Sequence, residues 1–233
     1  MIDTLREWLS NPVFTRWDDS LWENTLITLY MTIGTMVLTV LIGTPIGVLL
    51  HQTDHARTGA VRAVNGIVGF LVNVGRSFPF IILIIALIPV TRFIVGRATG
   101  PNAAMVALAV AAIPFLARLI EINLREVAHG KVEAVEMMGA GRWQLIRQVL
   151  LPEALPGIIG SITTTTIAVV GYTAMAGAVG GKGLGDLAIR KGYNSYETEV
   201  MVATVIILIV LVILVQAIGS RLANAVDHRA RAR

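Results

Sequence analysis

The residue types that carry out chemistry in proteins are few and scattered in this chain. It has no cysteine, which excludes disulfides, thiol catalysis and cysteine-ligated metals. Its four histidines have no paired spacing that suits a metal ion, and we expect them to be structural or interfacial; they are His51, His55, His129 and His228. No nucleophile has a recognisable base beside it. We therefore expect a protein without catalytic residues and without a metal site.

A Gly-rich stretch at residues 176–183, AGAVGGKG, comes nearest to a nucleotide-binding motif. A phosphate-binding P-loop begins with glycine and ends with Gly-Lys followed by serine or threonine, whose hydroxyl binds Mg²⁺. Here Ala176 stands at the first of these positions and Gly183 at the last. We therefore expect no ATP site and no cofactor in this chain.

A charged, helix-prone segment at residues 133–152, EAVEMMGAGRWQLIRQVLLP, lies between two long apolar runs. Its pattern predicts a short helix over residues 131–138 and a turn at residues 139–141. The turn begins with a glycine, which can supply a positive φ. A second helix is predicted over residues 142–151 and is expected to stop at Pro152, because proline cannot continue helical hydrogen bonding.

The first of these helices has the composition of a protein-binding surface. Ala134, Met137 and Met138 fall on overlapping faces, and alanine and methionine suit a compact, adaptable contact. Glu133 is available for a basic partner. We predict that the helix docks into another protein; the alternative is an amphipathic helix that lies on lipid.

The segment resembles the cytoplasmic coupling loop of permease subunits from bacterial ATP-driven (ABC) importers. Their pattern is Glu-Ala-Ala, three residues, Gly, nine residues, Ile, one residue, Leu-Pro. The spacing is intact here, with Val135 in place of the second alanine and Val149 in place of the isoleucine. The resemblance implies that the helix inserts into a separate ATPase subunit. The residues assigned to this coupling are Glu133, Ala134, Met137, Met138, Gly139, Leu151 and Pro152.

Two further stretches are assigned to a substrate path. Arg76 lies in an apolar run, where a charge costs at least about 2.5 kcal/mol on insertion scales, so we expect it to face the bundle interior or an aqueous cavity. There it either binds a carboxylate or donates to carbonyls of a broken helix. Small residues at 171–177, GYTAMAG, leave room, and Met175 offers a flexible thioether, although core packing is its alternative role. The path residues are Arg76, Ser77, Tyr172 and Met175.

The elements that must position these residues are membrane spans. Hydrophobic residues make up 55% of the 233, charged residues only 15%, and the mean hydropathy is +0.73, which is typical of an integral membrane protein. A helix needs about 20 apolar residues to cross the hydrocarbon core. Runs at residues 25–50, 98–117, 154–181 and 200–220 suffice alone. Residues 63–91 are predicted to form one more span, broken near residues 73–79, which gives five in an all-α protein.

Charge distribution orients the spans, because cytoplasmic loops carry an excess of Lys and Arg. With the coupling loop inside, eleven basic residues lie in inner segments and seven in outer ones, so the N-terminus is outside and the C-terminus cytoplasmic. A six-span alternative, split at Arg76, places Arg57 and Arg62 outside and fits less well.

Three regions follow from this topology. Residues 1–24 are predicted to form an external amphipathic segment, with Trp8, Trp17 and Trp22 at headgroup level. Residues 25–220 form the permease domain, with the coupling loop at 118–153. Residues 221–233 form a basic cytoplasmic tail.

Residues 76–80, RSFPF, resemble a run in the amino-acid-importing branch of these permeases, and nearly the whole chain resembles the permeases of methionine importers. The resemblance implies the type I ABC importer architecture and a homodimer in the bacterial inner membrane. It also implies two ATPase subunits that carry ATP and Mg²⁺, and an extracytoplasmic substrate-binding protein. The implied substrate is methionine, in its L and D forms.

Two other functions stay open. One is import of another small amino acid by a permease of the same family. The other is an ion-coupled carrier or channel, which usually needs intramembrane Asp, Glu or His; no acidic residue lies within the five predicted spans. No nucleic-acid partner is expected.

Overall fold

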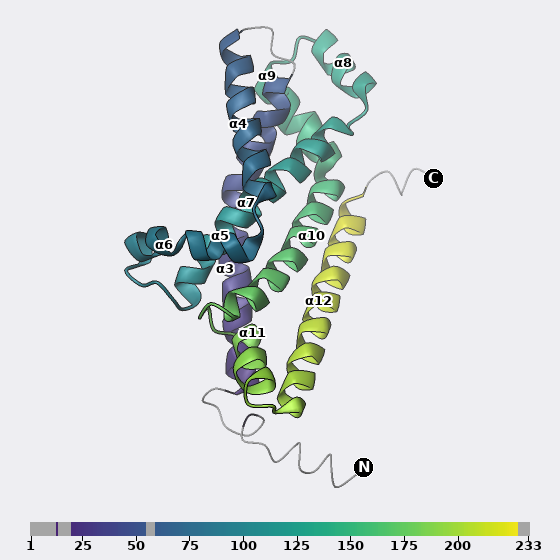
Figure 1. The fold of residues 1–233 in the computed structure, drawn as a ribbon. Helices are drawn as coiled ribbons and strands as arrows, with labels where there is room; N and C mark the ends of the chain where they lie inside the picture. The colour runs from purple at the N-terminus through teal and green to yellow at the C-terminus, as the bar shows by residue number, and fades with distance from the viewer. Residues whose placement is uncertain (1–12, 14–19, 55–58, 228–233) are drawn as a thin grey trace. The chain divides into compact units, whose positions relative to one another are not determined.

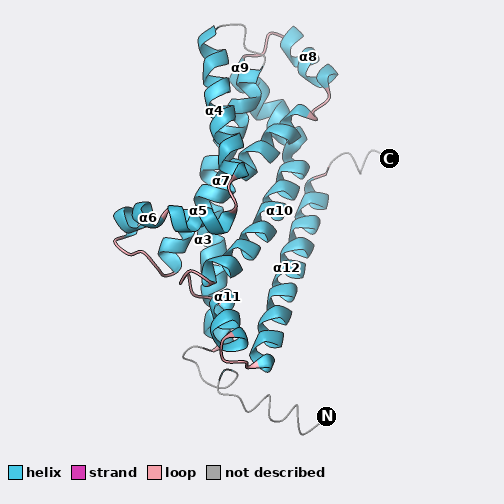
Figure 2. Ribbon diagram, viewed as in Figure 1, coloured by secondary structure: helices cyan, strands magenta, loops and turns pink. Residues whose placement is uncertain are grey.

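The computed structural model of the chain describes Val13, residues 20–54 and residues 59–227, and every regular element in these ranges is a helix (Figures 1 and 2). The α-helices are α3 (Leu21–Asp54), α4 (Gly59–Ser77), α5 (Phe80–Ala86), α6 (Ile88–Val95), α7 (Pro101–Arg125), α8 (His129–Met137), α9 (Arg142–Leu145), α10 (Leu151–Gly177), α11 (Leu184–Leu187) and α12 (Thr198–Val226). Two π-helical segments, Ile146–Leu150 and Ala188–Tyr193, follow α9 and α11.

Four helical stretches of the described chain are long and apolar enough to cross a membrane: α3, α7, α12 and the run Arg142–Gly177. Helices α4 and α5 meet the same criteria together, as a pair bent by 106°. The break between them falls at Phe78 and Pro79, within the predicted region. The prediction of an all-α protein is confirmed for the described residues, which hold four candidate spans, or five when α4 and α5 count as one broken span.

The helices extend further than the apolar runs. Helix α3 begins at Leu21 rather than at residue 25, because the amide of Glu23 donates to Ser20 Oγ at 3.2 Å and so caps the first turn. Helix α7 continues to Arg125, and α12 continues to Val226, into the segment predicted as a tail. Most of the predicted N-terminal segment, including Trp8 and Trp17, and the tail from residue 228 onward lie outside the described residues.

The chain folds into two compact units, of which the first comprises Met1–Val37, Phe78–Ala112 and Thr166–Leu214. One of its cores gathers buried side chains that include Met31, Phe80 and Leu108. Thr28 Oγ1 accepts a hydrogen bond from the amide of Leu184 at 2.9 Å, so residues distant in sequence are joined. Gly183 makes that approach possible, because its φ is +87° and an added Cβ would stand 2.7 Å from the same hydroxyl.

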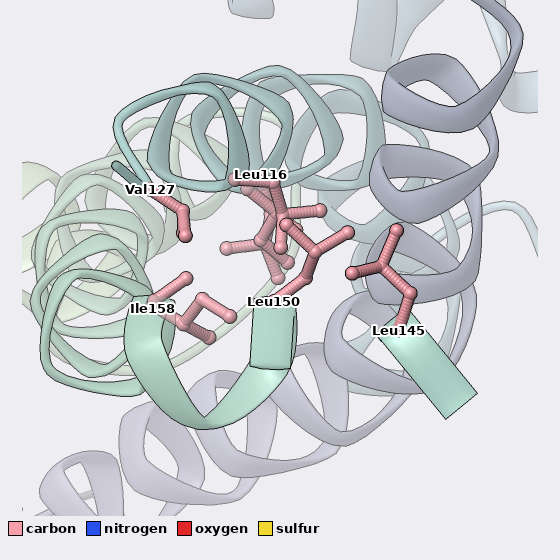
Figure 3. Close-up of a cluster of buried hydrophobic side chains, with 8 residues drawn as sticks. Leu116, Val127, Leu145, Leu150 and Ile158 are labelled. Carbon is pink, nitrogen blue, oxygen red and sulfur yellow. The ribbon is translucent and has the colours of Figure 1, made fainter. Parts of the chain in front are cut away.

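The second unit comprises Leu38–Ser77, Ile113–Thr165 and Val215–Arg233. Its main core is a cluster of eight buried side chains contributed by α7, α9, α10 and the segments beside them (Figure 3). They are Leu116, Ile120, Leu124, Val127, Leu145, Leu150, Ala154 and Ile158. The segment at residues 129–141 packs against this core.

The prediction that Pro152 stops the second loop helix is wrong. Helix α9 continues through the π-helical segment Ile146–Leu150 directly into α10, and the whole run is helical. The amide of Leu151 donates to the carbonyl of Ile146, five residues back. A proline ring in a regular α-helix clashes with the carbonyl four residues earlier. The wider π turn ahead of Pro152 relieves that clash, and the helix continues.

Candidate functional site

Helix α8 lies beside α9 at one end of the second unit and is held there by apolar contacts and an ion pair (Figure 1). Val132 and Val135 pack against the main core of this unit, and Val127, just ahead of the helix, belongs to that core. Lys131 Nζ lies 2.6 Å from Glu153 Oε1, which ties α8 to the first turn of α10. One face of α8 therefore packs against the core, and the opposite face is exposed.

Backbone hydrogen bonds cap the C-terminus of α8. The amide of Gly139 donates to the carbonyl of Glu136 at 2.9 Å, and the amide of Ala140 donates to the carbonyl of Val135 at 3.3 Å. These two bonds form a Schellman motif, which requires a left-handed residue after the helix. Gly139 has a φ of +79°, and an added Cβ would meet nothing within 4 Å. The predicted positive φ is confirmed, and backbone geometry alone requires the glycine.

The outward face of α8 and its turn carries large exposed apolar side chains. Met137 is 90% exposed and Met138 76% exposed, while Ala134 and Glu133 are also exposed. Glu133 Oε1 lies 3.1 Å from His129 Nε2, an ion pair when the imidazole is protonated. Exposed methionines that are held on a fixed helix form a surface suited to binding another protein. The structure thus brings together the five predicted residues 133, 134 and 137–139.

Trp143, in α9, is 72% exposed and was missed by the sequence analysis. An aromatic residue between charged and polar neighbours, Arg142 and Gln144, is the signal that could have identified it, since tryptophan is common at protein interfaces. Leu151 packs against the main core, whereas Pro152 is exposed. These last two predicted coupling residues therefore differ in accessibility.

A cluster of charges ahead of α8 was also missed. Glu121, in the last turns of α7, is 2% exposed. Its carboxylate lies 2.6 Å from Arg118 Nη1 and 2.5 Å from Arg125 Nη2. Arg125 also lies 3.0 Å from Asp54 Oδ2, at the end of α3. The spacing Arg-x-x-Glu-x-x-x-Arg, which places ion partners on one helix face, is the sequence signal.

Arg76 and Ser77, predicted path residues, end α4 in the second unit. The Arg76 guanidinium carbon lies 5.9 Å from the ring centroid of Phe115, a cation–π contact, and the residue is otherwise exposed. Ser77 Oγ donates to the carbonyl of Asn73 at 2.8 Å, four residues back. Arg76 thus has an aromatic neighbour on α7 and remains accessible to a ligand.

Tyr172 and Met175, the other predicted path residues, lie on α10 in the first unit. The Tyr172 ring stacks on that of Phe80, with centroids 4.7 Å apart and planes 13° apart. Met175 is 49% exposed, although its neighbours Thr173 and Ala176 are buried. Met175 is therefore half-exposed on this chain and is not part of the buried core described for this unit.

The described residues contain no group of three or more His, Asp or Glu side chains that could hold a metal ion.

Comparison with known proteins identifies the relatives of this chain. A family model described as binding-protein-dependent transport system inner membrane component matches residues 43–232. The probable D-methionine transport system permease protein MetI of Vibrio cholerae is 48% identical over 227 residues, which cover 97% of this chain and 99% of that protein. The methionine import system permease protein MetP of Bacillus subtilis is 44% identical over 209 residues, which cover 90% of this chain and 94% of that protein.

Two solved structures also match this chain. A structure of the MetNI methionine ABC transporter in inward-facing conformations includes a chain that is 43% identical, with a TM-score of 0.87; the match covers 94% of this chain and all of that chain. A chain of an amino acid ABC transporter with histidines matches with a TM-score of 0.71 at 18% identity, over 88% of this chain and 93% of that chain, and shares the fold.

Proposed function

Because the chain belongs to the family of binding-protein-dependent transport system inner membrane components, we propose that it imports methionine as the permease subunit of an ABC importer. The observation that carries the proposal is the likeness, along nearly the whole chain, to proteins named as methionine permeases. The substrate includes both the L and the D form. A permease of this family does not itself hydrolyse ATP; a separate subunit does.

The proposed assembly is a homodimer of this chain with two ATPase subunits, which hold ATP and Mg²⁺. An extracytoplasmic binding protein delivers the substrate. The chain lies in the bacterial cytoplasmic membrane with its N-terminus outside and its C-terminus in the cytoplasm. The excess of Lys and Arg in the inner segments supports this orientation.

We assign α8 as the coupling helix, the element that docks into the ATPase. The exposed side chains of Met137 and Met138 supply its apolar contact, and Glu133 supplies a charge at its edge. Because Val132 and Val135 fix the opposite face to the core, a displacement of the helix is passed to the helices of that core. Closure of the ATPase dimer on ATP can move the spans in this way.

We assign substrate contacts in each unit separately, to the exposed residues Arg76 and Ser77 in the second unit and to Tyr172 and Met175 on α10 in the first. An amino acid carries a carboxylate and, in methionine, a thioether. In the second unit, the exposed guanidinium of Arg76 suits the carboxylate. In the first unit, the half-exposed Met175 suits a flexible apolar side chain. Weak contacts of this kind allow passage, whereas a tight site would retain the substrate.

Uptake by the complete transporter in lipid vesicles tests the substrate. Labelled L-methionine is offered to vesicles that contain the permease and its ATPase, with the binding protein present. Unlabelled L-methionine, D-methionine, leucine and histidine are added separately as competitors. We expect ATP-dependent uptake that both methionine forms reduce and that leucine and histidine leave unchanged. Uptake reduced by another amino acid and not by methionine would assign the chain to a different substrate. Uptake driven by an ion gradient without ATP would exclude the ABC mechanism.

A further inference from the structure

Glu121 is a buried carboxylate in the second unit whose two oxygens are both engaged. Oε2 accepts from Arg118 Nη1 at 2.6 Å, and Oε1 accepts from Arg125 Nη2 at 2.5 Å. Its side chain is 3% exposed, whereas those of the two arginines are 34% and 43% exposed. A buried charge is costly unless it is paired and hydrogen-bonded, and here two guanidinium groups provide both.

Arg125 extends this pair to a second helix. The same Nη2 atom that binds Glu121 lies 3.0 Å from Asp54 Oδ2, so Arg125 bridges the last turn of α3 and the last turns of α7. The four groups carry two positive and two negative charges, and only Glu121 is buried. Glu121 therefore sets where Arg125 lies, and Arg125 in turn holds the end of α3.

The cluster stands immediately before the coupling helix in the chain. Arg125 is the last residue of α7, Val127 is buried in the main core, and α8 begins at His129. A shift of α7 at Arg125 therefore changes both the contact with α3 and the point from which α8 departs.

We propose that Glu121 is a positioning residue for energy coupling, which acts through Arg125. By holding Arg125 between itself and Asp54, it joins the inner ends of α3 and α7 so that they move as one when the coupling helix is displaced. The inference rests on the proposed function, since it assumes that α8 receives motion from an ATPase.

A purely structural role for Glu121 makes a different prediction. If the carboxylate only stabilised the fold, its loss would lower the amount of assembled transporter, and each assembled transporter would still carry the normal amount of substrate per ATP. If it positions α3 and α7 for coupling, the ratio of transport to hydrolysis falls in transporters that are fully assembled.

Glu121→Gln tests this prediction, with Glu126→Gln as the matched control. Both substitutions remove one negative charge from the same stretch of chain, but Glu126 is exposed. We expect Glu121→Gln to assemble with the ATPase and to hydrolyse ATP within about twofold of wild type, while substrate carried per ATP falls about tenfold, the scale of one lost charge-assisted hydrogen bond. Glu121→Asp should restore part of the ratio, and Glu126→Gln should leave it unchanged.

A distance measurement provides a readout that does not depend on transport. The chain has no native cysteine, so spin labels can be placed at Gln52 on α3 and Ile122 on α7 in the assembled complex. We expect a narrow distance distribution in wild type and Glu126→Gln, and a broader one in Glu121→Gln. If Glu121→Gln does not assemble, Arg125→Gln, at an exposed position, serves instead. It should broaden the distance distribution in the same way and lower the amount of substrate carried per ATP by a similar factor.

An unchanged ratio, or an unchanged distance distribution, in an assembled variant that lacks the Glu121–Arg125 pair would overturn the inference. The ratio is measured with whichever substrate the wild-type transporter carries. A wild-type transporter that does not carry methionine would refute the proposed substrate, and the spin-label comparison would still decide the role of Glu121.

Discussion

The amide of Ala140 donates to the carbonyl oxygen of Val135 at 3.3 Å, so the turn that ends α8 closes on a residue whose side chain packs against the core. This bond exists only while the residue between them keeps a positive φ, and Gly139 does so at +79°. The direction in which the chain leaves α8 therefore depends on the position of Val135, which packs against the core.

Gly139→Val should uncouple the transporter, because a β-branched residue resists the left-handed conformation. Gly139→Asn is the matched control, since asparagine tolerates that conformation and an added Cβ meets nothing within 4 Å. We expect uptake to fall severalfold in the valine variant while membrane insertion is retained, and to stay near wild type in the asparagine variant. Equal uptake in both variants would show that the turn does not need a positive φ.

Met137→Asp should weaken binding of the ATPase, because a carboxylate would replace an apolar side chain on the proposed docking surface. We expect loss of co-purification with the ATPase and no change in the thermal stability of the permease, since Met137 is 90% exposed. Met137→Leu keeps the apolar character and should co-purify normally. Retention of the ATPase by the aspartate variant would place the docking surface elsewhere.

Gly47→Val should lower the stability of the permease, because α3 approaches α7 closely at this glycine. An added Cβ would lie 2.6 Å from the carbonyl oxygen of Ala117 and 2.9 Å from Ile120 Cβ. Overpacking of this kind costs about 1–3 kcal/mol. Gly66→Val, in α4, has nothing within 4 Å of the added Cβ and serves as the control. Thermal unfolding in detergent should separate the two variants, and equal midpoints would contradict the observed packing.

Single-cysteine labelling with an impermeant reagent tests the orientation of the chain. Cysteines at Arg62 and Lys131 should react only from the cytoplasmic face, and a cysteine at Lys182 only from the outer face. The background is clean, because the chain contains no native cysteine. Reaction of positions 62 and 131 from opposite faces would refute the five-span orientation.

Met175→Trp should obstruct the substrate path, since added volume in a narrow path is not easily absorbed. Met175→Ala should instead change the rate or the selectivity among apolar amino acids. Assembly with the ATPase should be unaffected in both variants, because Met175 lies in the other unit from the coupling helix. Unchanged uptake of methionine and its analogues in both variants would remove Met175 from the path.

The all-α class and the long apolar helices could be predicted from the sequence, because the bilayer demands such helices and leaves few alternatives. Short helices such as α6 and α11 were not predicted. Helix ends could not be predicted in the same way. Ser20 starts α3 through a side-chain cap, and the π turn at residues 146–150 carries the chain past Pro152; both effects are local hydrogen bonding that hydropathy does not report.

The turn at Gly139 could be predicted from residue type, because its positive φ favours glycine. The coupling role of the exposed Met137 and Met138 came from the family resemblance and is a proposal. The burial of Glu121 could not be predicted, because the predicted span ended at residue 117 and placed this residue in a polar loop. Only the continuation of α7 to Arg125 shows that its carboxylate is buried between two arginines. The environment of Arg76 was likewise beyond sequence reasoning, since its neighbour Phe115 comes from another helix.

Uptake of labelled methionine into vesicles that contain the permease and its ATPase tests the central claim most directly. The binding protein is outside and ATP is supplied on the ATPase side, with an ATPase defective in hydrolysis as the control. We predict accumulation of methionine above its outside concentration only when binding protein, ATP and the active ATPase are all present. Equal accumulation with the defective ATPase, or none with the complete system, would contradict the assignment of this chain as a methionine importer permease.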